Sequence, residues 1–225
     1  MKTNRRTARK TITRHKEGLV WILVGVLLMA SAFGLIAFNS WEDGRAGKRA
    51  ESAAEQLAKT MPEASQAFSD GEVVYPDYVL NPNMDMPVRE LHGQYYIGLL
   101  DIPAIGASLP VQQEWSYPNM KVSPCRYTGS VYLNNMVICA HNYQTHFGKL
   151  EELCVGDAVY FTDMDGNKFS FKVKEIDTLA SDAVHEMVFG GWDLTLFTCT
   201  IDGGSRATVR CSKSASEPVS SMGQG

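Results

Sequence analysis

The chain has 225 residues, of which 44% are hydrophobic and 20% charged, a composition typical of one middle-sized globular domain with additional segments. Its net charge of −4 is unevenly distributed, because residues 1–17 carry seven Lys or Arg and one Glu (+6), which leaves −10 for the remainder. The remainder is acidic and has no basic stripe, which disfavours a nucleic-acid-binding protein. This contrast indicates that the two parts lie in different environments.

Residues 18–41 form an uncharged apolar segment directly after the basic tail. A helix of this length, rising about 1.5 Å per residue, spans a hydrocarbon core of about 30 Å. Trp21 and Trp41 stand near its two ends, where interfacial aromatic residues are common, and the basic tail predicts a cytoplasmic N-terminus. The alternative is a signal peptide cleaved near the Ala-Ser-Ala sequence of residues 30–32. The length of the apolar run favours a retained, single-pass anchor.

Residues 42–93 are expected to form an extracellular stalk. The stretch 51–59 has high helix propensity and predicts a short helix that ends near Pro62. Scattered prolines among Asp, Asn and Met then predict an extended linker. A lid over a functional site is the alternative for residues 76–93, and the spacer is favoured.

Residues 94–213 consist of short apolar segments separated by turn signals, without a long helical period, which predicts an antiparallel β-barrel. Residues 161–169 predict a hairpin that turns at the Asp-Gly pair 165–166. This hairpin superficially resembles a calcium loop, but Lys174 occupies the position of the bidentate Glu, which excludes an EF-hand. The tail, residues 214–225, is rich in Ser and Gly and is expected to be disordered.

The end of one predicted strand carries a candidate catalytic histidine. Residues 136–140 form a short apolar run typical of a buried strand, and His141 follows it directly. A histidine at this position can present its imidazole to a cleft while its backbone stays fixed. His146 is the alternative, but its place before Phe147 favours a packing role, so His141 is the candidate general acid and base.

The end of a second predicted strand carries a candidate nucleophile. Side chains in residues 193–200 alternate as in a strand, and Cys199 lies near the end of this predicted strand. After a short turn, a new alternating segment begins at Arg206. A cysteine beside a cation on the returning strand suits a thiolate nucleophile with an anion stabiliser. Arg210 shares a strand face with Arg206 and is the alternative. Arg206 is favoured because it is nearer the turn.

These residues resemble a known family. The Thr-Leu-Phe-Thr-Cys sequence of residues 195–199 resembles the TLxTC signature of sortases, the cysteine transpeptidases of Gram-positive cell surfaces. His141 and Arg206 stand where that family has its catalytic histidine and arginine, and residues 96–103 resemble its opening strand. The resemblance covers roughly residues 94–212. It implies an all-β fold, a closed eight-stranded sortase-type β-barrel with one or two short helices, preceded here by the transmembrane helix.

The resemblance also implies a reaction. Cys199 attacks the Thr–Gly bond of an LPXTG-like sorting signal and forms a thioacyl enzyme, which an amine then resolves. His141 first donates a proton to the leaving amine and later accepts one, and Arg206 supports the substrate carbonyl or the developing oxyanion. Three neighbouring residues are expected to contact the substrate, Thr198 through its backbone or hydroxyl: Thr198, Leu196 and Asn142.

The implied partners are surface proteins with a C-terminal sorting signal and, as amine acceptor, a lipid-linked peptidoglycan precursor or a pilin lysine. The catalytic domain would lie on the outer face of the cell membrane. Without a second apolar span, an anchoring role is favoured over pilus assembly. The residues after His141 are Asn142 and Tyr143, not the arginine seen in many members, which leaves the preferred sorting motif open. The alternatives are a surface cysteine protease and a non-catalytic, membrane-tethered β-domain.

The five cysteines indicate neither a disulfide scaffold nor a zinc site, because their number is odd and no pair has CxxC spacing. Cys199 is expected to be free, and Cys139, inside an apolar run, is most simply a small buried hydrophobe. The state of the others stays open. No metal or cofactor is expected, and calcium dependence is left open.

Overall fold

The computed structural model describes residues 4–62, 68–69, 72–73, 75–200 and 203–214. The chain divides into two compact units, Met1–Gly44 and Arg45–Gly225, and helix α1 (Asn4–Thr60) contributes to both. In the first unit, the large apolar side chains of residues 19–41 are exposed, and the helix contains a window with a mean hydropathy of 2.6. By length and composition, α1 can cross a membrane. The predicted N-terminal apolar helix is therefore confirmed.

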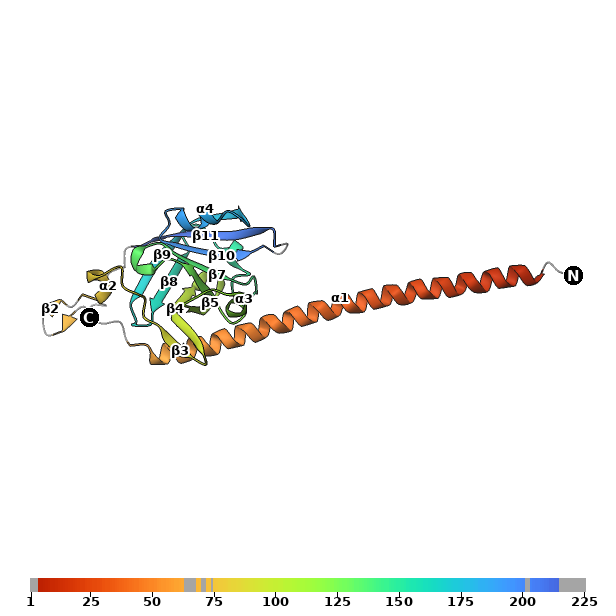
Figure 1. Cartoon of the computed structure of the whole chain (residues 1–225), viewed down its shortest axis with the longest axis horizontal. Coiled ribbons are helices and arrows are strands. Elements are labelled where there is room, and N and C mark those ends of the chain that lie inside the picture. Colours follow the sequence, from red (N-terminus) through yellow and green to blue (C-terminus); the bar gives the residue numbers. More distant parts are fainter. Residues whose placement is uncertain (1–3, 63–67, 70–71, 74, 201–202, 215–225) are drawn as a thin grey trace, which may run out of the picture. The chain divides into compact units, whose positions relative to one another are not determined.

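In the second unit, eight of the described strands close into a barrel (Figure 1). The order of hydrogen-bonded neighbours is β4-β5-β6-β7-β10-β11-β9-β8, and β8 pairs back with β4. The pairs β5–β6 and β7–β10 are parallel, and the others are antiparallel. The predicted closed eight-stranded β-barrel is confirmed. Its strands are β4 (Gln94–Ile102), β5 (Ala107–Gln112), β6 (Cys125–Thr128), β7 (Met136–Ala140), β8 (Ala158–Asp163), β9 (Lys168–Ala180), β10 (Leu194–Cys199) and β11 (Ser205–Lys213).

Three further strands and several short helices are not part of this barrel. Strand β3 (Arg89–Leu91) pairs with β4 through a two-residue turn, where His92 and Gly93 have φ of 52° and 74°, typical of a tight hairpin. Strands β1 (Phe68–Ser69) and β2 (Glu72–Val73) form a separate pair. The short helices are α2 (Asp77–Leu80), α3 (Tyr117–Met120), α4 (Val184–Phe189) and the 3-10 turns η1 (Pro103–Ile105), η2 (Val131–Leu133) and η3 (Leu150–Glu152).

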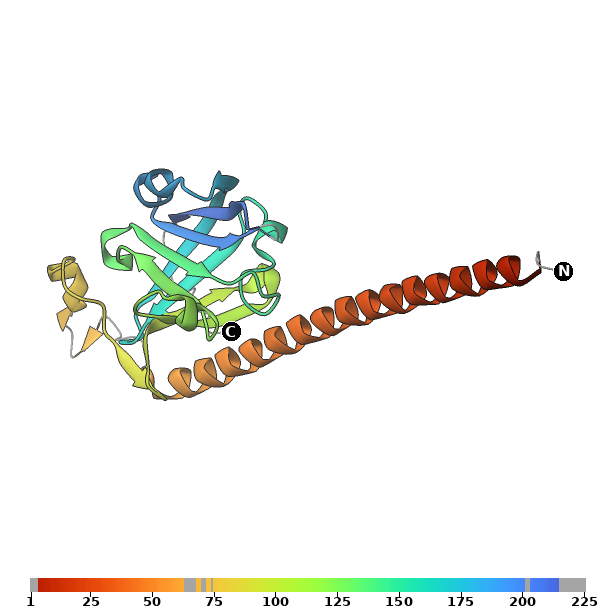
Figure 2. The ribbon, with the colours of Figure 1, turned by 45° about the vertical axis from the view of Figure 1, so that its right-hand side comes forward.

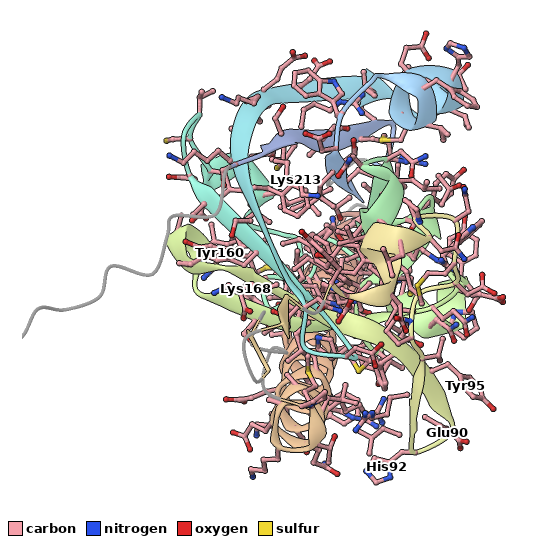
Figure 3. All side chains as sticks on the ribbon, turned by 90° about the vertical axis from the view of Figure 1, so that its left-hand side faces the viewer. Glu90, His92, Tyr95, Tyr160, Lys168 and Lys213 are labelled. Atoms are coloured by element: carbon pink, nitrogen blue, oxygen red, sulfur yellow. The ribbon has the colours of Figure 1, made fainter. Side chains whose placement is uncertain are left out.

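Alternating apolar residues fill the barrel. In the β8–β9 hairpin, Val159 faces Phe171 and Phe161 faces Phe169, and all four side chains are buried in the main core cluster. Residues between them on the strands face outward, as the period of two requires. On the outer face, the ammonium of Lys168 lies 4.2 Å from the ring centre of Tyr160 (Figure 3).

The predicted turn at residues 165–166 is confirmed, and a buried carboxylate holds it. Gly166 has a φ of 84°. Asp163 accepts hydrogen bonds from the backbone N–H groups of Asp165 (3.0 Å) and Asn167 (2.9 Å). The hydroxyl of Tyr132 donates to the second oxygen of Asp163 at 2.8 Å, and burial together with this acceptor raises the pKa of Tyr132. The side chain of Asp163 thus organises the hairpin, because a buried polar group is stable only when its hydrogen bonds are satisfied.

Parts of the expected stalk pack on the barrel. The helix predicted at residues 51–59 is the last part of α1, and its Leu57 is 1% exposed. Farther on, Met86 belongs to the main core cluster, and the ring of Tyr78 stacks on Tyr132 with centroids 4.8 Å apart. Residues 45–60 and this later segment are therefore not a free spacer, because their apolar side chains complete the core.

Candidate active site

The parallel register of β7 and β10 brings the predicted histidine and cysteine together. Thr198 pairs with Ala140, so the next residue of each strand, Cys199 and His141, stands at the same end of neighbouring strands. Ala140 and Thr198 are buried, whereas Cys199 is exposed and His141 is half-buried. Because side chains alternate along a strand, the cysteine and the histidine share the outer face of the sheet.

Arg206 is the cross-strand partner of Cys199. The two residues face each other in the antiparallel β10–β11 register, a position that puts their side chains on the same face with Cβ atoms about 5 Å apart. The guanidinium Nη1 of Arg206 donates hydrogen bonds to the carbonyl oxygens of Ser205 (2.9 Å) and Gly203 (3.3 Å). These bonds hold the guanidinium beside the turn at the cysteine end of the strand.

Arg210, the alternative to Arg206, is part of the framework. It is 4% exposed, and its guanidinium donates to the carbonyl oxygens of Glu186 (2.9 Å) and Met187 (3.2 Å) and to the hydroxyl of Thr195 (3.2 Å). Burial lowers the pKa of Arg210. The residue therefore fixes α4 on the sheet, next to β10 and β11 (Figure 2). Arg206, in contrast, lines the pocket that contains Cys199.

A pocket of about 190 Å³ collects the three candidate residues. One side is aromatic: Trp115 lies 5.5 Å from Tyr127, and Tyr127 makes an edge-to-face contact with Phe197 at 5.4 Å between ring centres. The opposite side is apolar and comes from the end of β9 and from α4. The lining residues are Trp115, Tyr117, Met120, Tyr127, Cys139, Ala140, His141, Ala180, Ser181, Ala183, Val184, Met187, Phe197, Cys199 and Arg206.

A second hollow of about 470 Å³ adjoins this pocket and shares the side chains of Trp115 and Tyr127 with it. It carries both an acidic and a basic group, Glu114 and Arg126, and the Nε of Arg126 donates to the carbonyl of Gln113 at 3.0 Å. The hollow is lined by the segment that follows β5 and by β6, the strand next to β7. It therefore lies on the histidine side of Cys199.

The loop after β7 is compact and supports His141. The ring of Tyr143 stacks on the imidazole with centroids 4.9 Å apart and planes at 24°. The backbone N–H groups of His146 and Gly148 both donate to the carbonyl of Tyr143, at 2.9 and 2.8 Å. His146 is 1% exposed, which separates it from the pocket and gives it the packing role expected from sequence.

A model of the sortase domain matches residues 100–214, more than half of the chain. The chain belongs to the sortase family. No protein with a curated description matches it. Among solved structures, it is similar to sortase D5 of Clostridium perfringens, with 18% identity, a TM-score of 0.50, and coverage of 75% of this chain and 97% of the other. That likeness supports the shared fold.

Two further sortase structures resemble this chain. Sortase C1 of Streptococcus agalactiae has 26% identity over 54% of this chain and 71% of the other, with a TM-score of 0.49. Sortase A of Corynebacterium diphtheriae has 20% identity over 79% of this chain and 86% of the other, with a TM-score of 0.48.

Two predicted substrate contacts of this sortase change with the structure: the side chain of Leu196 is not available to a substrate, and Thr198 is left with its backbone alone. Leu196 is fully buried in the main core cluster, so its side chain packs the barrel and does not face a substrate. Thr198 is 4% exposed, and its hydroxyl donates to the carbonyl of Ala140 at 2.9 Å. The hydroxyl therefore ties β10 to β7, and only the backbone of Thr198 stays a predicted contact. Asn142, which follows His141, is half-buried, and its contact with the substrate also stays a prediction.

All five cysteines, which lie in the described part of the chain, are free thiols. Cys154 and Cys199 are exposed. The others are buried, and burial raises the pKa of Cys125 and of Cys211 to about 12 and that of Cys139 further. Within the residues that the structure covers, no group of three His, Cys, Asp or Glu could hold a metal ion, and the expectation that no cofactor is needed stays a prediction.

The aromatic side of the pocket was not predicted from the sequence. Phe197 could have been found, because it lies two residues before Cys199 and must share its face. Trp115 and Tyr127 come from a loop and from a neighbouring strand, so only the folded barrel brings them to the site. Tyr143 was noted as a departure from the family pattern, and its stacking on His141 gives it a structural role.

The possible lid of residues 76–93 does not reach this pocket, whose lining residues run from Trp115 to Arg206. Figures 1 and 2 show α2 at the end of the barrel away from the end of β10. Glu90, His92 and Tyr95 extend outward at the β3–β4 hairpin (Figure 3). His92 therefore lies outside the residues that line the pocket.

Proposed function

We propose that this sortase is a membrane-anchored cysteine transpeptidase. It would cleave an LPXTG-like C-terminal sorting signal and transfer the protein to an amine of a cell-wall precursor or of a pilin. One observation carries the proposal: two strand registers place Cys199 beside both His141 and Arg206 at one pocket. A thiol, an imidazole and a guanidinium are the groups that acyl transfer needs as nucleophile, proton carrier and oxyanion stabiliser.

In the first half-reaction, the thiolate of Cys199 attacks the carbonyl carbon of the scissile peptide bond, and a C–S bond forms. The negative charge moves to the carbonyl oxygen, where Arg206, facing Cys199 across the strands, donates hydrogen bonds. The C–N bond then breaks, and protonated His141 gives its proton to the leaving amine. The product is a thioester between the sorted protein and Cys199.

In the second half-reaction, an acceptor amine attacks the thioester, neutral His141 takes the proton from that amine, and the thiolate of Cys199 leaves. Since His141 serves both the leaving and the entering amine, both must pass on its side of Cys199. The strand order β6-β7-β10-β11 puts His141 on one side of Cys199 and Arg206 on the other. The acyl part of the signal therefore occupies the Arg206 side.

The linings of the two hollows agree with this division. The Arg206 side has apolar walls from Ala180, Val184 and Met187, which suit the apolar residues of an LPXTG-like signal. The His141 side leads past Trp115 and Tyr127 to the hollow that holds Glu114 and Arg126. Aromatic faces and a carboxylate attract an ammonium group, so we assign the entry of the acceptor amine to this side.

The proposed location follows from the apolar part of α1 and the basic residues before it. The helix would anchor the protein in the cell membrane of a Gram-positive bacterium, with the N-terminus cytoplasmic and the barrel outside. There the barrel would meet surface proteins that carry sorting signals, and a lipid-linked peptidoglycan precursor or a pilin lysine.

The test incubates the full-length protein in detergent micelles with LPXTG-type peptides, with and without glycine or lysine-type amines. Mass spectrometry follows the products, and Cys199→Ala is the matched control. A ligated product that depends on Cys199 is the expected result. Hydrolysis that is indifferent to added amine would indicate a protease instead. Absence of turnover with every peptide, together with an unchanged cellular phenotype of Cys199→Ala, would indicate a non-catalytic domain.

A further inference from the structure

The second part of α1, residues 45–60, presents one buried face to the barrel. Its buried residues recur at the spacing of a helix face, four, three, one and three residues apart. Its last three buried residues, at positions 53, 54 and 57, pack against Tyr96 and Leu99 of β4 and against Met164. Arg89 of β3 donates to the last carbonyl of the helix, that of Thr60, at 2.7 Å. The buried face consists of Ala46, Ala50, Ala53, Ala54 and Leu57.

This helix also contacts the loop that carries the catalytic histidine. A Cβ atom on Gly47 would lie 2.6 Å from the Cγ2 and 2.8 Å from the Cβ of Thr145, distances that real Cβ atoms do not adopt. The helix backbone therefore lies directly against Thr145, and glycine permits this approach. Ala50, one turn later, shares the main core cluster with Phe147, which follows Thr145 in the loop.

Contacts within the loop connect Thr145 to the imidazole. The N–H of Phe147 donates to the carbonyl of His141 at 3.3 Å, which closes the loop at its base. The carbonyl of Tyr143 accepts two backbone N–H groups from the far side of the loop, and its ring stacks on His141. Because these hydrogen bonds and the ring contact connect the two sides of the loop, a displacement of Thr145 is expected to shift Tyr143 and the imidazole of His141 as well.

We propose that Gly47 and Thr145 are positioning residues: the close contact between them holds the loop so that His141 stays beside Cys199. The proposal rests on the proposed transpeptidase function, in which His141 carries the proton. The helix that continues from the apolar segment would thus be part of the catalytic unit.

The test substitutes Gly47→Ala in the full-length protein in detergent micelles. The added methyl group must displace Thr145, and a misplacement of a catalytic group by about 1 Å lowers the rate about a hundredfold. We expect kcat for peptide ligation to fall by about that factor while KM changes little. Gly44→Ala is the matched control, because nothing lies within 4 Å of a Cβ at that position of the same helix.

A second measurement separates this proposal from the proposed function. The rate of Cys199 alkylation by iodoacetamide, read by mass spectrometry of the modified peptide, needs no sorting signal. The exposed thiol of Cys154 serves as an internal reference in the same molecule. If His141 is displaced, Gly47→Ala reproduces most of the change in Cys199 reactivity that His141→Ala produces, and leaves Cys154 unchanged. This comparison holds even if the wild-type protein ligates no peptide.

The rescue variant is Thr145→Gly, which removes the three Thr145 atoms that the added methyl group would meet. In the double variant Gly47→Ala, Thr145→Gly, the reactivity of Cys199 is expected to return to that of Thr145→Gly alone. An alanine at position 47 that leaves the reactivity of Cys199 unchanged overturns the proposal. A change that Thr145→Gly does not reverse overturns it as well, and so does an equal change in Gly44→Ala. Thr145→Gly alone tests the contact from the loop side if Gly47→Ala does not fold.

Discussion

At the scale of single residues, substitution of the two arginines of β11 is predicted to have different effects, on activity in one case and on stability in the other. Arg206→Ala removes a donor to the oxyanion, so kcat is expected to fall about 10²- to 10³-fold while the free energy of unfolding changes by no more than about 0.5 kcal/mol. Arg210→Ala leaves the carbonyl oxygens of Glu186 and Met187 without their buried donor, which costs about 3 kcal/mol. Urea unfolding and peptide-ligation kinetics measure the two effects. If Arg206→Ala instead lowered the free energy of unfolding, the prediction would be wrong, because Arg206 would then have the structural role assigned to Arg210.

Thr198→Val tests the corrected role of the motif threonine. Valine has the same shape but cannot donate to the carbonyl of Ala140, so unfolding is expected to become easier by about 1 kcal/mol. Thr198→Ser keeps the hydroxyl and is the matched control. If the hydroxyl instead contacted the substrate, Thr198→Val would raise KM and leave stability unchanged.

The candidate site residues that the sequence could place are those that stand at strand ends. Cys199, His141 and Arg206 each stand at or next to a strand terminus, where the turn signals were clear, and strand parity fixed their faces. Parity could not separate Arg206 from Arg210, because both lie on one face. The separation needed the three acceptors around Arg210, which come from α4 and β10.

At the scale of elements, the second part of α1 is predicted to be a structural member of the domain. Leu57→Ala opens a cavity between α1 and β4, so the free energy of unfolding is expected to fall by about 2–5 kcal/mol. Lys48→Ala, on the exposed face of the same helix, is the control and should change it by less than about 0.5 kcal/mol. Urea unfolding of both variants makes the comparison. Equal stability of the two would mean that this face does not pack on the barrel.

Sequence predicted the helix in this segment but not its packing. Four of its five buried residues are alanines, which indicate helix propensity as strongly as burial. The partners of the last three, Tyr96, Leu99 and Met164, belong to β4 and to the β8–β9 hairpin, so only the closed barrel reveals the contact. The strands themselves were predictable, since alternation in β8 and β9 follows directly from one buried face.

At the scale of the whole molecule, the three buried thiols predict a loss of stability in alkaline solution. In the folded protein, the pKa of Cys125 and of Cys211 rises from 9.0 to about 12, and burial raises that of Cys139 in the same direction. Above pH 9, the unfolded chain releases thiol protons that the folded chain retains, so the unfolded state binds fewer protons and stability falls as pH rises.

The fall should begin near pH 9 and continue toward pH 12. Each thiol contributes up to about 1.4 kcal/mol per pH unit, so the three together approach a slope of about 4 kcal/mol per unit above pH 10. Between pH 9 and 10 the fall is about 3 kcal/mol, because the thiols of the unfolded chain are only partly ionised at pH 9. Urea unfolding at pH 8, 9 and 9.5 measures it, below pH 10, the ordinary pKa of tyrosine, above which the buried tyrosines add a fall of the same sign. Cys211→Ala should lower the slope by about one third whatever its effect at pH 8. A slope that is flat between pH 9 and 9.5 would contradict the burial of these thiols, and with it the closed packing of β6, β7 and β11 on which the active-site register depends.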